Sequence, residues 1–246
     1  MVEFSPEETR RYARHLVLKG IGGPGQQRLK AARVLVIGAG GLGSPVIAYL
    51  AAAGVGTLGV VDNDTVSLSN LQRQIVHATS AVGLLKTESA RAHVAALNPH
   101  VIFVAHPVRL DPVNAPGLLS GYDLVIDGSD SFATRLAVAE AAETAKLTLV
   151  SGAVSMFDGQ VTVFAPHLTG AGGAPNPGFR DLYPDTPDEA DLPACEAIGV
   201  LGAVTGVIGT LMAMEAIKLI TGAGEVLAGR LMLYDRRAAR FTELEF

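Results

Sequence analysis

Cysteine, tryptophan and charged side chains are scarce in this 246-residue chain, which has one cysteine, no tryptophan and 17% charged residues. One cysteine excludes a disulfide within the chain and every zinc site built from two or more of its cysteines, and it is typical of a reducing compartment. Low charge together with 49% hydrophobic residues excludes a disordered chain, because such chains lack the apolar surface that offsets ordering entropy. We expect a folded cytoplasmic protein with a sizeable core.

An excess of positive charge is also missing. The 19 Lys and Arg residues against 24 Asp and Glu residues give a net charge of −5, so we expect no binding to nucleic acid or anionic membranes through the surface as a whole. Two uncharged runs, Val34 to Val61 and Ala197 to Met214, are long enough to be tested as membrane spans. Glycines interrupt the first run, and we interpret the second as a buried central or interface helix.

Strand and helix patterns alternate through residues 1–150. Helices are predicted over residues 6–15, 26–31, 45–53, 84–97 and 132–145, and strands over residues 34–37, 58–61, 101–104, 124–126 and 147–150. This alternation predicts the α/β class with a Rossmann-like, doubly wound parallel sheet. Later strands at residues 160–164, 231–234 and 241–244 accompany one helix at residues 198–220 and should extend the sheet in antiparallel fashion. Residues 166–193 are expected to form an irregular loop.

A glycine-rich turn separates the first parallel strand from its helix, with Gly38, Gly40, Gly41 and Gly43. Glycine permits a tight turn and a close approach of the backbone to phosphate, and the helix N-terminus presents unpaired N–H groups. Asp62 ends the next strand, where a carboxylate can accept hydrogen bonds from ribose hydroxyls. The pattern favours an adenine nucleotide over a bare packing turn and leaves NAD, FAD and ATP open.

Two cations lie downstream of the glycine turn: Arg73 follows Asp64, and Lys86 opens the next helix. Their presence favours ATP among these nucleotides. Splitting a triphosphate at its α-phosphorus requires positive charge at both the reacting centre and the leaving pyrophosphate. Asp130 and Ser131 follow the fourth strand, at the edge where open α/β sheets bind ligands. Asp130 either caps the following helix or holds Mg²⁺, which takes one or two carboxylates plus phosphate oxygens and water.

Several segments spread over nearly the whole chain resemble the MoeB/ThiF family, the bacterial relatives of ubiquitin-activating enzymes. They are Arg11-Tyr12-x-Arg14-His15-Leu16, GAGGLGSP at 38–45, YLAAAGVG at 49–56, VDND at 61–64, LSNLQRQ at 68–74, Leu97-Asn98-Pro99 and DGQVTVF at 158–164. The LSNLQRQ segment is far more specific than the glycine turn.

The resemblance implies a homodimeric adenylyltransferase that uses ATP and Mg²⁺ to activate the C-terminal glycine of a ubiquitin-like sulfur-carrier protein of the MoaD or ThiS type. The carrier would end in Gly-Gly and would become a thiocarboxylate in molybdopterin or thiamine biosynthesis, with a sulfurtransferase or cysteine desulfurase as a further partner. Residues 1–246 would form one adenylation domain, with a helical arm (1–30), a nucleotide-binding part (31–150) and a part for carrier binding and dimerisation (151–246).

The resemblance also implies roles for individual residues. Asp62 would bind the ribose, Arg73 and Lys86 the phosphates, and Asp130 the metal. Arg14 resembles an arginine that the partner subunit inserts toward the triphosphate. Further residues of the nucleotide site would be Gly38, Gly40, Gly41, Gly43, Asp64, Ser69, Asn70 and Ser131.

The chain departs from the family at its cysteine positions. Many members hold a structural zinc between two Cys-x-x-Cys pairs, but Gly178 and Asp181 occupy the positions of the first pair, and no second pair precedes Phe246. We therefore expect no zinc. Cys195 lies where some members use a thiol in a covalent link to the carrier, and the alternative is an inert small residue near a helix start.

Two other functions are compatible with the residues alone. The first is an oxidoreductase that binds NAD or FAD at the same glycine turn, although no acid/base pair for hydride transfer accompanies the fingerprint. The second is a noncatalytic nucleotide-binding partner, which the missing zinc ligands favour more than usual.

Overall fold

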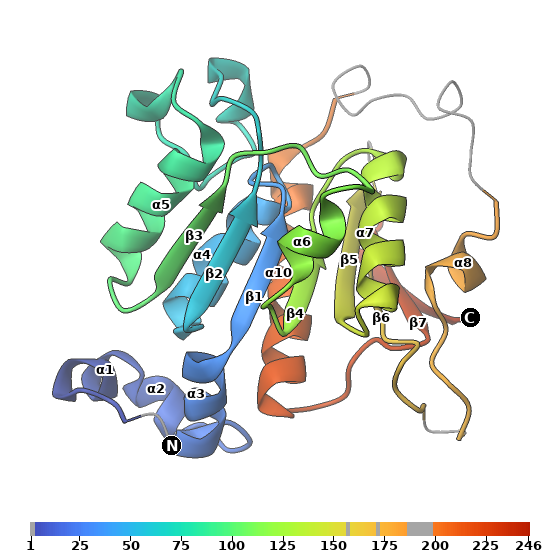
Figure 1. The fold of residues 1–246 in the computed structure, drawn as a ribbon, viewed down its shortest axis with the longest axis horizontal. Coiled ribbons are helices and arrows are strands. Elements are labelled where there is room, and N and C mark those ends of the chain that lie inside the picture. The colour runs from blue at the N-terminus through green and yellow to red at the C-terminus, as the bar shows by residue number, and fades with distance from the viewer. Residues whose placement is uncertain (1–2, 156–157, 171–172, 186–198) are drawn as a thin grey trace.

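A single eight-stranded sheet forms the centre of the computed structural model, which describes residues 3–155, 158–170, 173–185 and 199–246. Its strands are β1 (Arg33–Ile37), β2 (Thr57–Val61), β3 (Ile102–His106), β4 (Leu124–Asp127), β5 (Thr148–Val154), β6 (Asp158–Phe164), β7 (Arg230–Asp235) and β8 (Arg240–Glu245). They lie in the order β3-β2-β1-β4-β5-β6-β7-β8 (Figure 1). The first five are parallel and the last three antiparallel, which confirms the predicted sheet.

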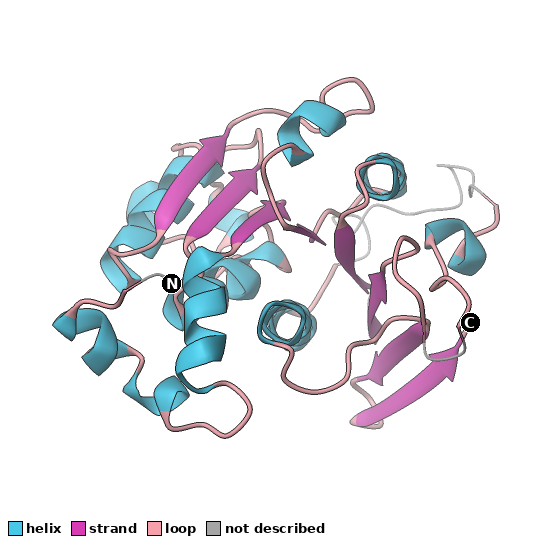
Figure 2. Cartoon of the chain, turned by 60° about the horizontal axis from the view of Figure 1, so that its bottom comes forward, coloured by secondary structure: helices cyan, strands magenta, loops and turns pink. Residues whose placement is uncertain are grey.

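Helices cover both faces of the sheet (Figure 2). They are α1 (Pro6–Arg11), α2 (Ala13–Leu16), α3 (Gly22–Ala31), α4 (Gly43–Ala53), α5 (Lys86–Leu97), α6 (Ala115–Leu119), α7 (Phe132–Thr144), α8 (Phe179–Leu182) and α10 (Gly202–Thr221), and two 3₁₀ turns span Leu68–Asn70 and Thr79–Ala81. In β1, Val34 and Val36 belong to the core shared with α4 and α10, whereas Leu35 and Ile37 belong to the core under α6 and α7. Burial on both faces explains the unbroken apolar run of this strand.

Helix α10 is the element that composition alone could assign to a membrane. It spans 20 residues, and an 18-residue window within it has a mean hydropathy of 1.6, so it is long and apolar enough to cross one. In the structure it is a core helix, because it packs against α3, α4, β5 and β6 and buries Val204, Ile208, Met212 and Ala216. The interpretation of this run as a buried central helix is confirmed.

The structure corrects two helices near the N-terminus. The helix predicted over residues 6–15 breaks at Tyr12, whose buried ring is held by a hydrogen bond that Asn98 Nδ2 donates to its hydroxyl at 2.9 Å. The helix predicted to begin at residue 26 begins at Gly22. A Cβ at Gly25 would lie 2.9 Å from Ile21 Cγ2, so Gly25 allows close packing inside this helix.

Differences further along the chain are smaller. The short helices α6 and α8 have no predicted counterpart, and α8 lies within the stretch 166–193 expected to be irregular. Helix α10 begins at Gly202, after residues 199–201 that are not helical, and residue 198 lies outside the described residues. None of these changes affects the strand order. That order reverses between β1 and β4, and an open α/β sheet binds its ligand at such a reversal, beyond the carboxyl ends of the strands.

Candidate functional site

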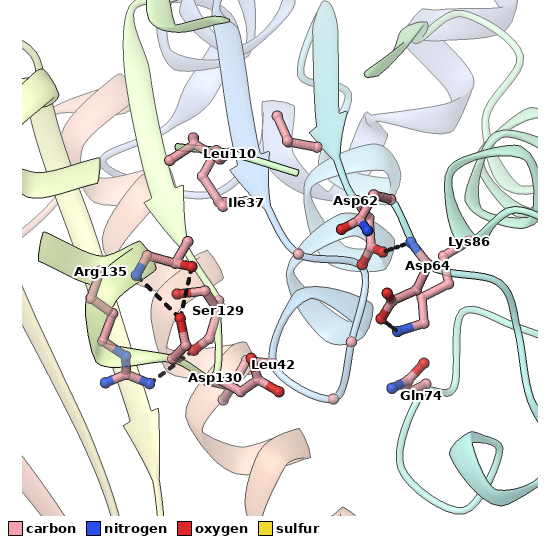
Figure 3. A pocket seen from close by; sticks show the side chains of 18 of the residues that line it. Ile37, Leu42, Asp62, Asp64, Gln74, Lys86, Leu110, Ser129, Asp130 and Arg135 are labelled. Carbon is pink, nitrogen blue, oxygen red and sulfur yellow. Dashed lines mark hydrogen bonds and ion pairs between the residues drawn. The ribbon is translucent and has the colours of Figure 1, made fainter. Parts of the chain in front are cut away.

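A pocket of about 310 Å³ lies at this reversal, beyond the ends of β1, β2 and β4 (Figure 3). The structure brings nine of the sequence-predicted residues together in its lining, namely Gly38, Gly40, Gly41, Asp62, Asp64, Arg73, Lys86, Asp130 and Ser131. Gly43, Ser69, Asn70 and Arg14 do not line it.

The glycine turn is shaped by sterics at two positions. Gly38 has a φ of 88°, and a Cβ at Gly43 would lie 1.8 Å from the Gly38 carbonyl oxygen, so Gly43 closes the turn without facing the pocket. A Cβ at Gly40 would meet only the Gln74 side chain, at 3.8 Å. The N-cap of α4 is Leu42, which provides no side-chain hydrogen bond, and the Ser44 N–H in the first turn donates to the Gly40 carbonyl at 2.9 Å. The helix start is thus without a side-chain cap, and the helix dipole favours an anion there.

Asp62 is fixed beside the glycine turn by two backbone donors. Its Oδ2 accepts from the Ala39 N–H at 2.8 Å, and its Oδ1 accepts from the Asp64 N–H at 2.9 Å. Both contacts hold the carboxylate at the end of β2, where it lines the pocket. This is the position at which a carboxylate accepts from ribose hydroxyls in nucleotide-binding folds of this type.

Lys86 is a buried cation at the start of α5, with 6% of the residue exposed. Its Nζ lies 2.8 Å from Asp64 Oδ2, and its backbone N–H donates to the Asp64 carbonyl at 2.9 Å. Figure 3 shows the two side chains paired on one side of the pocket. In this structure Asp64 therefore neutralises the buried charge of Lys86.

Asn70 and Ser69 shape the turn that carries Arg73. Asn70 is buried, its Oδ1 accepts from the Ser67 N–H at 3.2 Å, and its carbonyl accepts from the N–H groups of Arg73 and Gln74 at 3.1 and 3.0 Å. The Ser69 carbonyl accepts from Arg73 Nη1 at 3.3 Å. In this structure both residues therefore position Arg73 and Gln74, which line the pocket themselves.

The loop after β4 supplies the opposite side of the pocket. Ser131, and not Asp130, is the N-cap of α7, because its Oγ accepts from the Thr134 N–H at 3.1 Å. Asp130 is exposed and lines the pocket, which leaves its carboxylate available to a ligand. Of the two roles that the sequence left open for Asp130, the structure excludes the helix cap.

Asp127 lies beneath this loop and is fully buried. Its Oδ1 accepts from the Ser129 N–H at 3.0 Å, while Oδ2 has no hydrogen-bond partner among the described residues. Burial raises the pKa of this carboxyl group, and the nearby positive charge of Arg135 opposes the rise. Arg135 in turn donates from Nη2 to the Ser129 carbonyl at 2.9 Å. The backbone N–H and the carbonyl of Ser129 are therefore both hydrogen-bonded.

Several lining residues escaped the sequence reasoning. Gln74, Arg109, Ser129, Arg135 and Thr205 all line the pocket. Gln74 directly follows Arg73, and Arg135 lies four residues after Ser131 on the same face of α7, so spacing could have indicated both. Thr205 carries no such signal, because it reaches the pocket only through the packing of α10, where its Cγ2 lies 3.0 Å from a Cβ placed on Gly41.

The remaining predicted residues lie away from the pocket. Arg14 is on α2, which Figure 1 shows below the sheet, at the end opposite to the carboxyl ends of the parallel strands. Cys195 lies outside the described residues. At the positions of the family's first cysteine pair, the Gly178 N–H donates to Asp181 Oδ2 at 2.7 Å, and α8 begins there.

Known proteins resemble the chain over most of its length. It is 50% identical over 235 residues to the probable adenylyltransferase/sulfurtransferase MoeZ of Mycobacterium tuberculosis, a match that covers 94% of this chain and 58% of MoeZ. It is 47% identical over 243 residues to the sulfur carrier protein adenylyltransferase of Thermus thermophilus, covering 99% and 89% of the two chains. The SAMP-activating enzyme E1 of Haloferax volcanii is 43% identical over 236 residues, covering 96% and 84%.

Solved structures share the fold. PaaA has a TM-score of 0.82 at 22% identity, covering 98% of this chain and 74% of its own, and Escherichia coli MccB with ATP has a TM-score of 0.78 at 21% identity, covering 96% and 71%. Residues 12–246 match the ThiF family. From this match and from the identity to its relatives, the chain belongs to the ThiF family.

Proposed function

We propose that this protein transfers the adenylyl group of ATP to the C-terminal glycine of a ubiquitin-like sulfur-carrier protein of the MoaD or ThiS type. The observation that carries the proposal is the gathering of the glycine turn, Asp62, two cations and Asp130 around one pocket, in a chain 47% identical over 99% of its length to a sulfur carrier protein adenylyltransferase. The activated carrier would be converted to a thiocarboxylate for molybdopterin or thiamine biosynthesis in the cytoplasm, with a sulfurtransferase or cysteine desulfurase as sulfur source.

In the reaction, a carboxylate oxygen of the carrier attacks the α-phosphorus of ATP, and the bond from that phosphorus to the bridging oxygen breaks. Pyrophosphate leaves with the electron pair, and an acyl-adenylate forms. Asp62 binds the ribose, and the glycine turn with the N-terminus of α4 approaches the phosphates. Arg73 and Lys86 stabilise the charge that develops on the phosphates, a contribution that is largest in a pocket from which water is partly excluded.

Asp130 is the residue that we propose for Mg²⁺. Among the described residues, no group of three or more His, Cys, Asp and Glu side chains could hold a metal by itself. An exposed single carboxylate beside a phosphate site suits Mg²⁺, which keeps several waters and binds through one or two carboxylates together with substrate phosphates. When bound, Mg²⁺ would neutralise phosphate charge during the transfer.

We further propose that the enzyme is a homodimer in which Arg14 of each subunit completes the pocket of the other. Exposed apolar side chains occur in the segment that carries Arg73 and Lys86: Leu68, Ile75 and Leu85 are 69%, 62% and 37% exposed. Val17, three residues after Arg14, is 79% exposed. A second copy that covers these surfaces would remove them from water and would bring an arginine to the pocket rim.

Carrier-dependent exchange of labelled pyrophosphate into ATP tests the proposed activity. Exchange that requires a carrier ending in Gly-Gly and Mg²⁺ is expected, because adenylation is reversible before the acyl-adenylate is consumed. An oxidoreductase or a noncatalytic nucleotide-binding partner would give no exchange. Failure with every MoaD-type and ThiS-type carrier would exclude the proposal.

Mixing two inactive variants tests the role of Arg14. Arg14→Ala and Lys86→Ala should each abolish exchange. Reassortment of equal amounts of the two should restore about a quarter of the activity, because about half of all dimers become mixed and each mixed dimer holds one intact pocket of two. No recovery after reassortment would show that Arg14 acts within its own subunit or not at all.

A further inference from the structure

Arg135 is a cation of the pocket to which the proposed chemistry gives no task. It lies on α7, lines the pocket, and is half-buried. Among the residues that the structure describes, its guanidinium makes one hydrogen bond, from Nη2 to the Ser129 carbonyl, and no ion pair. A guanidinium group carries five N–H donors, so most of its donors are available to a ligand.

Four cations line the pocket. Lys86 and Arg73 come from the segment between β2 and α5, Arg109 comes from the segment between β3 and α6, and Arg135 comes from α7. Figure 3 shows Lys86 with Asp64 on one side of β1, and Arg135 with Ser129 and Asp130 on the other. Positive charge is therefore available from opposite sides of the glycine turn, with the carboxylate proposed for Mg²⁺ beside Arg135.

Adenylyl transfer brings two anionic groups to one phosphorus from opposite directions. The attacking oxygen and the leaving oxygen lie roughly in line in phosphoryl transfer, so the carboxylate approaches from the side away from the pyrophosphate. If Arg73 and Lys86 serve the pyrophosphate, the attacking carboxylate meets the opposite side of the glycine turn. We propose that Arg135 binds the C-terminal carboxylate of the carrier and directs it at the α-phosphorus, an assignment that rests on the proposed function.

The surroundings of Arg135 suit this task. Helix α7 is anchored by the Ser131 cap, and the Ser129 carbonyl, itself held through the bond of the Ser129 N–H to Asp127, fixes one nitrogen of the guanidinium. A guanidinium held on one side keeps its orientation while its other nitrogens receive both oxygens of a carboxylate. Asp127 makes no ion pair with Arg135 among the described residues, so it does not occupy the guanidinium.

The test compares two forms of one carrier that supports pyrophosphate exchange, one with its natural C-terminal carboxylate and one with a C-terminal carboxamide. Binding of each form is measured in the presence of α,β-methylene ATP, which cannot be cleaved. The unsubstituted enzyme should prefer the carboxylate by at least about tenfold, the size of one charge-assisted hydrogen bond. Arg135→Gln should abolish this preference, and Arg135→Lys should retain part of it because it keeps the charge without the bidentate geometry.

Two controls separate binding from folding. Arg91→Gln removes an arginine from the exposed face of α5, where it pairs with Glu88, and should keep the full preference. The affinity for α,β-methylene ATP without carrier should be unchanged in Arg135→Gln, which shows that the nucleotide pocket is intact.

The outcomes distinguish this assignment from the proposed function. If Arg135→Gln keeps the full preference for the carboxylate, or loses nucleotide affinity as strongly as carboxylate preference, Arg135 does not bind the carrier terminus, while exchange by the unsubstituted enzyme still supports adenylation. If the unsubstituted enzyme shows no exchange with any carrier, the proposed function fails, and the Arg135 assignment fails with it.

Discussion

The central strands of the parallel part of the sheet and the last strand of its antiparallel part differ in how far they are buried. Four of the five residues of β1 are buried, as are all five of β2, whereas all six residues of β8 are exposed. The parallel part (β1–β5) ends its strands at the pocket and supplies nearly all of its polar lining. The antiparallel part (β6–β8) reaches the pocket through the helix between its strands, α10, which carries Thr205.

Both parts of the sheet contribute to the pocket. The parallel part provides the glycine turn and the charged residues of the pocket. Helix α10, which follows β6 in the chain, packs against α4, the helix that begins at this turn. We therefore expect substitutions of the charged residues in the parallel part to lower activity, and substitutions in the packing contact of α10 to lower stability.

The largest effect is expected from the charges of the parallel part. Arg73→Ala and Asp130→Ala should lower the rate of pyrophosphate exchange by at least about 10²-fold to 10³-fold. Arg73→Ala removes a positive charge at the phosphates, and Asp130→Ala removes the carboxylate proposed for Mg²⁺. Cys195→Ala should leave exchange intact, because adenylation precedes any step at a thiol. Loss of exchange in Cys195→Ala would contradict the assignment of this residue to a later step.

Packing between the two parts should come next. A Cβ at Gly209 of α10 would lie 2.4 Å from both the Leu42 carbonyl oxygen and Pro45 Cγ, so Gly209→Ala should destabilise the protein by about 1–3 kcal/mol in urea unfolding. Gly206→Ala is the matched control in the same helix, because a Cβ there meets no atom within 4 Å outside the helix's own backbone. That variant should gain up to about 1 kcal/mol from helix propensity. Equal effects of the two substitutions would contradict close packing of α10 on α4.

These packing contacts also mark the limit of what the sequence predicts. The strands, the glycine turn and the positions of Asp62 and Lys86 follow from local patterns, since each element carries its own apolar period or stop signal. The break at Tyr12 depends on Asn98, and the pocket position of Thr205 depends on how α10 lies against α4. Contacts between distant segments of this kind leave no local pattern in the chain.

Acid should weaken the parallel part through His77, with a smaller effect. Burial lowers the pKa of His77. Its Nε2 lies 2.9 Å from the Ala39 carbonyl, so that nitrogen donates, and Nδ1 accepts from the Ser89 hydroxyl at 2.9 Å. The folded protein then binds fewer protons than the unfolded chain below about pH 6.5, and stability should fall as pH decreases through that range.

His77→Gln keeps a donor for the Ala39 carbonyl and removes the titrating ring. The urea midpoint of this variant should fall less between about pH 7.5 and about pH 5.5 than that of the unsubstituted protein. His167→Gln is the control in the antiparallel part, because His167 is exposed. If His167→Gln changes the pH dependence as much as His77→Gln does, the acid sensitivity does not reside in the parallel part.

The smallest effect is expected from metal chelation in the antiparallel part. Segment 178–183 is held by the Gly178 cap and by the ring of Phe179, whose centroid lies 4.9 Å from that of Tyr183 and 5.5 Å from that of Phe164. A segment packed in this way needs no zinc to fix it, so EDTA should change the Tm by less than about 1 °C in the absence of ATP. Phe179→Ala supplies the positive control, because emptying this ring cluster should lower the Tm clearly. One zinc per chain by elemental analysis, with a fall in Tm on chelation, would show that other ligands replace the missing cysteines.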